Sequence, residues 1–174
     1  DHPPGFRWLH ESFGTNWRML EMQAAIGRIQ LRRMTEWHSA RTRNAAILGE
    51  KIAPFAGANG VIRLPVLDQA GSIHAQYKYY AYVRPDRLAT GWDRDRIVEE
   101  IGARGVPCFQ GSCSEVYLEK AFDGTEWRPE SPLVHAKDLG ATSLMWLVHP
   151  TLTAEQLQRA SQATADVLAA ASRR

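Results

Sequence analysis

The first long segment of the chain predicts a helix that is apolar on two faces. In the stretch FGTNWRMLEMQAAIGRIQLRRM, which begins at Phe13, one set of apolar residues recurs at helical spacing: Met19, Met22, Ile26 and Ile29. A second set falls on another face: Leu20, Ala24, Leu31 and Met34. A surface helix normally has a single apolar stripe. We therefore expect this helix to be covered on two sides, either in the core of a larger protein or at a subunit interface.

The same helical pattern has recognisable limits. It runs from Trp17 to about Ile52, and Pro54 ends it because proline breaks the backbone hydrogen bonding of a helix. Thr15 or Asn16 could cap the first turn, since a short side-chain oxygen accepts from free N–H groups there. This length is well above the typical helix of about 11 residues, which favours an arm or spine.

The remainder of the chain alternates short strands and helices. Strand patterns cover 61–67, 75–83, 105–111 and 142–150, and helix patterns cover 93–102, 131–141 and 151–171. The last helix opens with Thr153 and Gln156, the spacing of a capping box. This order predicts an α+β fold. It consists of a long N-terminal helix (with its connecting segment, 1–53) and a small domain with a mostly antiparallel sheet and flanking helices (54–174).

Composition indicates an ordinary soluble globular protein. The 174 residues are 44% apolar and 23% charged, with a net charge of +2, which is typical of such proteins. The basic cluster Arg28, Arg32 and Arg33 has no interleaved aromatic residues, so it indicates a solvated helix face rather than a nucleic-acid site. No apolar run approaches the roughly 20 residues needed to span a membrane, and no signal peptide is recognisable. We expect a cytoplasmic protein, and the start DHPPGFRWLH is typical of a piece of a longer chain.

The chain shows no complete catalytic apparatus. Cys108 and Cys113 have four residues between them, whereas zinc and redox motifs prefer two, so no metal site is expected. Phosphate-binding loops, nucleophile elbows and paired metal-binding histidines are absent from the sequence. The turn Gly14-Thr15-Asn16 lies where N–H groups and the helix dipole would favour an anion such as phosphate. An ordinary helix cap is the alternative interpretation of that turn.

Two segments resemble a known family. GTNWRMLEMQAAIGRIQLRRM resembles the G-x-N-aromatic-R-M-x-E-x-Q-A-A-x-G-x-x-Q-L segment of the DegT/StrS family of sugar aminotransferases, which depend on pyridoxal 5'-phosphate. The tail LGATSLMWLVHPTLTAEQLQRASQAT is similar to the closing segment of that family. The resemblance covers nearly the whole chain and implies the small C-terminal domain of a fold type I aminotransferase.

The resemblance also implies roles for particular residues. In this family two subunits of a homodimer share each active site, and the motif asparagine reaches across to the cofactor phosphate of the neighbouring subunit. That residue is Asn16 here, and Arg18 matches the motif arginine near the same site. The lysine that binds the cofactor covalently would lie in a large cofactor-binding domain upstream of Asp1. We therefore expect this segment alone to be inactive.

One segment departs from the family pattern. Many members have a His-Tyr-Pro type sequence that approaches the sugar, whereas this chain has VPCFQGSCSEVYLEKAF. Phe109, Gln110 and Ser112 are then the candidate substrate contacts, with Gly111 between them. A loop variant without effect on specificity is the alternative.

The resemblance predicts an enzyme that transfers an amino group, usually from glutamate, to a keto-sugar nucleotide. Two other functions stay open. One is a non-catalytic interaction or regulatory domain that retains the small-domain fold. The other is a relative that uses the same cofactor for sugar dehydration, in which histidine replaces the lysine at a position outside this chain. The sugar, the aminated position and the role of the two cysteines do not follow from the sequence.

Overall fold

The computed structural model of the protein describes residues 12–14, 18–66 and 71–173. Its helices and strands follow one another as α1 (Glu21–Ile52), β1 (Ile62–Arg63), β2 (Tyr79–Val83), α2 (Arg94–Ala103), β3 (Cys108–Phe109), α3 (Val134–Thr142), β4 (Ser143–Trp146) and α4 (Ala154–Ala171). The predicted α+β class and the predicted order of helices and strands are confirmed. The division at residue 53 stays a prediction.

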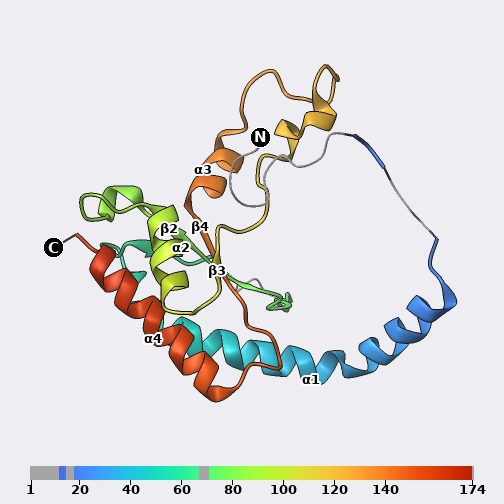
Figure 1. Cartoon of the computed structure of the whole chain (residues 1–174), viewed down its shortest axis with the longest axis horizontal. Coiled ribbons are helices and arrows are strands. Elements are labelled where there is room, and N and C mark those ends of the chain that lie inside the picture. The colour runs from blue at the N-terminus through green and yellow to red at the C-terminus, as the bar shows by residue number, and fades with distance from the viewer. Residues whose placement is uncertain (1–11, 15–17, 67–70, 174) are drawn as a thin grey trace.

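The sheet is antiparallel throughout. Its strands lie in the order β1-β2-β4-β3, and Figure 1 shows them between the long helices and α3. The central strand β4 is buried along its whole length, and its Trp146 lies opposite both Tyr79 of β2 and Cys108 of β3. Three of its four residues are apolar: Leu144, Met145 and Trp146.

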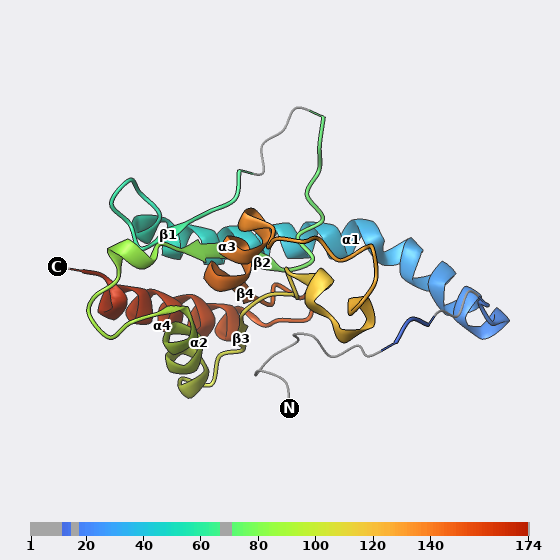
Figure 2. The ribbon, with the colours of Figure 1, turned by 90° about the horizontal axis from the view of Figure 1, so that it is seen from above.

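Helices α1, α2 and α4 enclose the core. α1 packs along α4, and α2 contacts α4, β3 and β4; Figure 2 shows α1 and α4 running side by side. The buried residues Leu48, Ile97 and Leu168 come from these three helices. α4 turns Ala163, Val167, Leu168 and Ala171 to this core.

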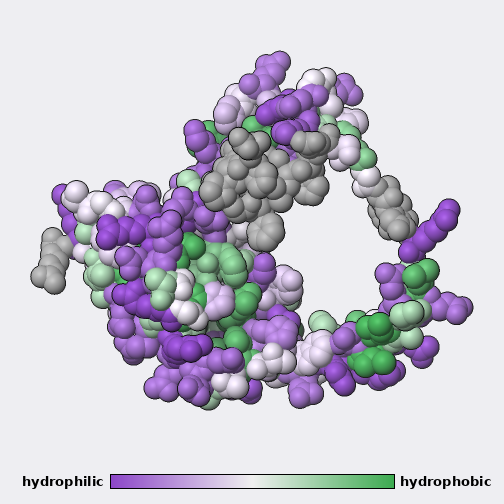
Figure 3. All heavy atoms as spheres, in the orientation of Figure 1, coloured by the Kyte–Doolittle hydropathy of each residue, from purple (hydrophilic) through white to green (hydrophobic). Residues whose placement is uncertain are grey.

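The first half of α1 extends away from this core. Every buried residue of the helix belongs to its last three turns: Asn44, Ala45, Leu48 and Ile52. Both apolar stripes of the first half are largely exposed, for example Met22 at 70% and Leu31 at 71%. Figure 3 shows these apolar atoms on the projecting part of the helix. The described part of the chain therefore does not cover the two-sided helix, and the cover expected from its pattern stays a prediction.

The helix begins later than the pattern predicts. Its first residue is Glu21 rather than Trp17, and Leu20 occupies the N-cap position. The side chain of Gln23 replaces a polar cap by accepting from the Leu20 N–H at 2.9 Å. The prediction that Thr15 or Asn16 caps this helix is therefore wrong, and both residues themselves lie outside the described ones.

Strand β2 is shorter than the predicted 75–83. Gln76 has φ of 47°, a left-handed conformation that ends an extended strand. The preceding loop is fixed to the middle of α1, because His38 bonds to the carbonyl of His74 and Arg41 donates to the carbonyl of Tyr77. Strand β2 therefore begins only at Tyr79, although the alternating pattern begins earlier.

The predicted capping box of α4 is confirmed. The Gln156 N–H donates to Thr153 Oγ1 at 3.2 Å, and the Thr153 N–H donates to Gln156 Oε1 at 2.9 Å. Two N–H groups that the helix cannot satisfy internally are paired in this way.

A buried amide joins α1 to the chain that leaves β4. Asn44 is 2% exposed, and its Nδ2 donates to the carbonyls of Val148 at 3.4 Å and His149 at 2.9 Å. No apolar pattern predicts this contact, because it depends on tertiary packing. It fixes the end of the sheet against the helix.

We predict that Asn44→Ala destabilises the protein. The substitution leaves buried carbonyls unpaired, which typically costs about 1–3 kcal/mol, and Asn44→Asp should cost more because it places an acceptor against acceptors. The midpoint of urea unfolding, followed by tryptophan fluorescence of the full-length protein, measures the effect. Ser39→Ala is the matched control, since that exposed hydroxyl bonds only to its own helix. An Asn44→Ala midpoint equal to that of the control would contradict the prediction.

Candidate functional site

The candidate substrate loop follows directly from β3. Phe109 ends that strand with 39% of its surface exposed, Gln110 is half-buried and Ser112 is exposed. Gly111 has φ of 90°, and a Cβ there would come within 3.0 Å of Ser143 Oγ. The left-handed backbone at this turn therefore requires glycine. The turn sets the directions in which the side chains on either side of it leave the backbone.

A buried arginine fixes this loop to the sheet. Arg94 is 6% exposed, and its Nη1 donates to the carbonyls of Gly140 at 3.0 Å, Ser143 at 3.1 Å and Gln110 at 3.4 Å. Its Nε donates to Asp95 Oδ1 at 2.6 Å. One side chain thus joins the start of α2, the end of α3, β4 and the candidate substrate loop.

Gln110 is held from both its backbone and its side chain. Its carbonyl also accepts a hydrogen bond from the Ser143 hydroxyl, and its Nε2 donates to Asp95 Oδ1 at 3.2 Å. The Gln110 amide NH2 is therefore engaged within the chain. Phe109 and Ser112 are the more accessible members of the predicted substrate set.

A tyrosine hydroxyl links the two ends of the segment that follows this loop. The Tyr117 hydroxyl donates to Glu115 Oε1 at 2.7 Å and accepts from the Leu133 N–H at 3.0 Å. The hydrogen bond to Glu115 raises the pKa of the Tyr117 hydroxyl, because ionisation would place two negative charges together. Tyr117 thus links Glu115 to the backbone at Leu133 through one hydroxyl.

An aromatic cluster connects this segment to the start of the chain. The Phe13 ring lies 5.2 Å from that of Phe122 and 5.6 Å from that of Trp127, edge-to-face in both pairs. Such pairs contribute about 0.5–1.5 kcal/mol each beyond their area. The residue immediately before the Gly14-Thr15-Asn16 turn is thereby packed on the segment that follows the candidate substrate loop.

Of the two predicted cofactor residues, the structure describes only Arg18. Asn16 is outside the described residues. Arg18 is exposed in extended chain just before α1, and Figure 1 shows the start of that helix far from β3. Within the described residues, the chain therefore does not bring Arg18 together with Phe109 and Ser112.

The two cysteines are both free thiols. Burial raises the pKa of the Cys108 thiol to about 12, so it stays protonated at neutral pH and is a poor nucleophile. In residues 12–14, 18–66 and 71–173, no three acidic, histidine or cysteine side chains gather as metal ligands. Nor does any helix in these ranges have the length and apolar character to cross a membrane.

Sequence reasoning missed Arg94. A signal was present, because acidic rather than basic residues are favoured in the first turn of a helix, and Arg94 directly follows the Asp93 cap. An arginine at that position indicates that its charge has partners elsewhere in the fold. Asp95 and Ser143 complete its network, and their roles follow only from the tertiary structure.

We predict that Arg94→Met loosens the candidate substrate loop. Several buried carbonyls lose a charged donor, and such losses typically cost about 1–3 kcal/mol each. Limited proteolysis of the full-length protein should show faster cleavage between residues 110 and 133, together with a lower melting temperature. Arg96→Met is the matched control, since that exposed arginine of the same helix contacts only Gly91, Trp92 and Glu100. Equal cleavage of the two variants would contradict a role in fixing the loop.

Comparison with known proteins places the chain in a family. Residues 3–164 match the model of the DegT/DnrJ/EryC1/StrS aminotransferase family. The chain is 31% identical over 153 residues to the dTDP-3-amino-3,4,6-trideoxy-alpha-D-glucose transaminase of Streptomyces venezuelae, covering 88% of this chain and 37% of that protein. It spans well under half of the relatives that it matches.

Solved structures agree with this placement. The aminotransferase from Psychrobacter cryohalolentis is 55% identical, with a TM-score of 0.82 over 97% of this chain and 44% of that one. The GDP-4-keto-6-deoxy-D-mannose-3-dehydratase of E. coli, solved with bound hydrated pyridoxal phosphate, shares the fold at 18% identity, with a TM-score of 0.66 over 86% of this chain and 36% of that one. Pyridoxal phosphate is the cofactor of this family. The chain belongs to the DegT/DnrJ/EryC1/StrS aminotransferase family.

Proposed function

We propose that the chain is the dimer-spanning helix and small domain of a pyridoxal-phosphate-dependent sugar aminotransferase. The parent enzyme transfers an amino group from an amino acid, glutamate in the first instance, to a keto-sugar nucleotide. The observation that carries this proposal is the 31% identity to a dTDP-amino-sugar transaminase over 88% of the chain. We place the parent protein in the cytoplasm as a homodimer.

The chemistry of two residues suits the cofactor phosphate. Asn16 brings an amide NH2 and Arg18 a guanidinium, and both donate hydrogen bonds without accepting in that role. A phosphate group is recognised by such donors, most strongly when they are charged. When bound, the cofactor supplies the electron-withdrawing ring that allows amino-group transfer. Asn16 and Arg18 would hold its phosphate and keep the ring in a fixed orientation.

The shape of α1 supports a site shared between two subunits. The start of the helix, next to Arg18, lies far from the candidate substrate loop of the same chain (Figure 1). Its exposed apolar residues Met22, Ile26 and Leu31 need a partner surface, because a large uncovered apolar patch is costly in water. A second subunit that packs on this helix would receive Asn16 and Arg18 at its own cofactor site.

The substrate side is assigned to the loop after β3. Phe109 offers an apolar ring that could cover a sugar or a base, and Ser112 offers a hydroxyl that can donate and accept. Gln110 has one N–H of its side-chain amide bound to Asp95, which leaves the other N–H and Oε1 to meet a substrate. The buried Arg94 would act on the substrate through the position of this loop.

An isotope-labelling experiment tests whether the enzyme transfers the amino group of glutamate to the sugar. The full-length protein, loaded with pyridoxal phosphate, receives glutamate carrying a heavy nitrogen isotope and a panel of keto-sugar nucleotides. We expect 2-oxoglutarate and an amino sugar that contains the labelled nitrogen. A deoxy sugar with release of labelled ammonia would favour dehydration instead. Absence of both products, together with no cofactor absorption, would favour a non-catalytic interaction domain.

A further inference from the structure

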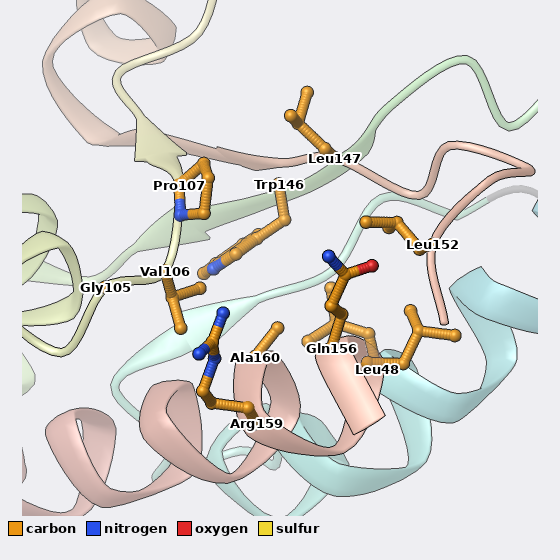
Figure 4. A pocket seen from close by; sticks show the side chains of 11 residues that line it. Leu48, Gly105, Val106, Pro107, Trp146, Leu147, Leu152, Gln156, Arg159 and Ala160 are labelled. Carbon is orange, nitrogen blue, oxygen red and sulfur yellow. The ribbon is translucent and has the colours of Figure 1, made fainter. Parts of the chain in front are cut away.

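A pocket of about 210 Å³ lies between α4, the chain entering β3 and the end of β4. Figure 4 shows its lining side chains, which come from segments far apart in sequence. A dry cavity of about 150 Å³ is enough to hold benzene. The pocket therefore has room for a single ring with a small substituent, and none of the residues assigned to cofactor or substrate above is among its lining residues.

The floor of this pocket is apolar and rigid. Val106, Trp146 and Leu157 line it, and all three are buried, with Trp146 only 1% exposed. Leu48 reaches it from the anchored half of α1. Because these residues belong to the packed core, the apolar surface is formed before any ligand arrives.

The polar groups that line the pocket are donors. The indole Nε1 of Trp146 is buried and has no hydrogen-bond partner. Gln156 uses its Oε1 to accept from Thr153, which leaves its NH2 to donate. Figure 4 shows Arg159 rising from α4 toward the edge of Trp146. Within the described residues the guanidinium of Arg159 makes no hydrogen bond or ion pair, and no carboxylate side chain lines the pocket.

We propose that this pocket binds a small aromatic carboxylate. The ring would lie against the accessible apolar side chains of Pro107, Leu147 and Leu152, above the buried Trp146. The carboxylate would accept from Arg159 and Gln156 at the mouth. A carboxylate has two oxygens with about four acceptor sites, which matches a lining that offers only side-chain donors. Burial of the ring supplies apolar contact, and the charge of Arg159 selects an anion over a neutral analogue. This proposal does not depend on the proposed function.

Titration calorimetry on the full-length protein tests the proposal with three probes. Benzoate has the ring and the charge, benzyl alcohol has only the ring, and acetate has only the charge. We expect saturable binding of benzoate, binding of benzyl alcohol weaker by roughly tenfold, as expected for loss of one charge-assisted hydrogen bond, and no measurable binding of acetate. The indole N–H resonance of Trp146 should shift as benzoate saturates.

Two variants test whether the probes bind in this pocket, and a third variant is a control. Arg159→Gln should weaken benzoate roughly tenfold and leave benzyl alcohol unchanged, whereas Arg43→Gln, an exposed arginine of α1 outside the pocket, should change neither. Ala160→Leu should fill the pocket and abolish both, with the melting temperature as a check on folding. Equal affinity for benzoate and benzyl alcohol, no effect of Arg159→Gln, or no saturable binding of benzoate would each overturn the proposal.

Discussion

The structure depends on one helix that has two different environments. The last turns of α1 are part of the core, where Leu48 and Ile52 pack against the sheet and α4. The first half presents apolar residues on both faces and has no cover within the described chain. Burial of apolar surface is the main stabilising contribution in folding and association. The helix therefore both anchors the small domain and requires a second surface, and this requirement is the basis of the shared-site proposal.

The small domain supports that helix through buried polar contacts. Asn44 fixes the end of β4 to α1, and Arg94 fixes the loop after β3 to both α3 and β4. Each of these side chains satisfies backbone carbonyls that would otherwise be buried without partners, which is costly. Arg94 also bonds to the carbonyl of Gln110, between Phe109 and Ser112. The buried contacts that hold β4 and α3 together therefore also position the candidate substrate loop.

The local features of the fold could be predicted from the sequence, whereas the tertiary contacts could not. The capping box at Thr153 and the strand at Ser143–Trp146 depend on neighbouring residues, and both are present. The start of α1 was predicted too early because the apolar pattern extends N-terminal to Glu21, the first residue of the helix. At the N-cap, the Gln23 side chain accepts a hydrogen bond from the Leu20 N–H. Strand β2 was predicted too long because alternation does not register the left-handed Gln76.

The candidate site shows the same division between local and long-range information. The departure from the family pattern singled out Phe109, Gln110 and Ser112 as one segment, and the structure places Phe109 in β3 with the other two just after it. The residues that hold the loop, Arg94 and Ser143, are far from it in sequence and were not predicted. The roles proposed for Asn16 and Arg18 involve a second subunit, so they rest on the family motif and not on contacts within this chain.

A mixed-subunit measurement tests the shared site most directly. One subunit carries Asn16→Ala in the full-length protein, and the other carries a substitution of its cofactor-binding lysine, so that each homodimer has impaired sites. If Asn16 serves the neighbouring subunit, a mixed dimer contains one site with both an intact lysine and an intact Asn16, and aminotransferase activity returns on mixing. If Asn16 serves its own subunit, no intact site forms. Activity that stays at the level of the separate homodimers would therefore contradict the account.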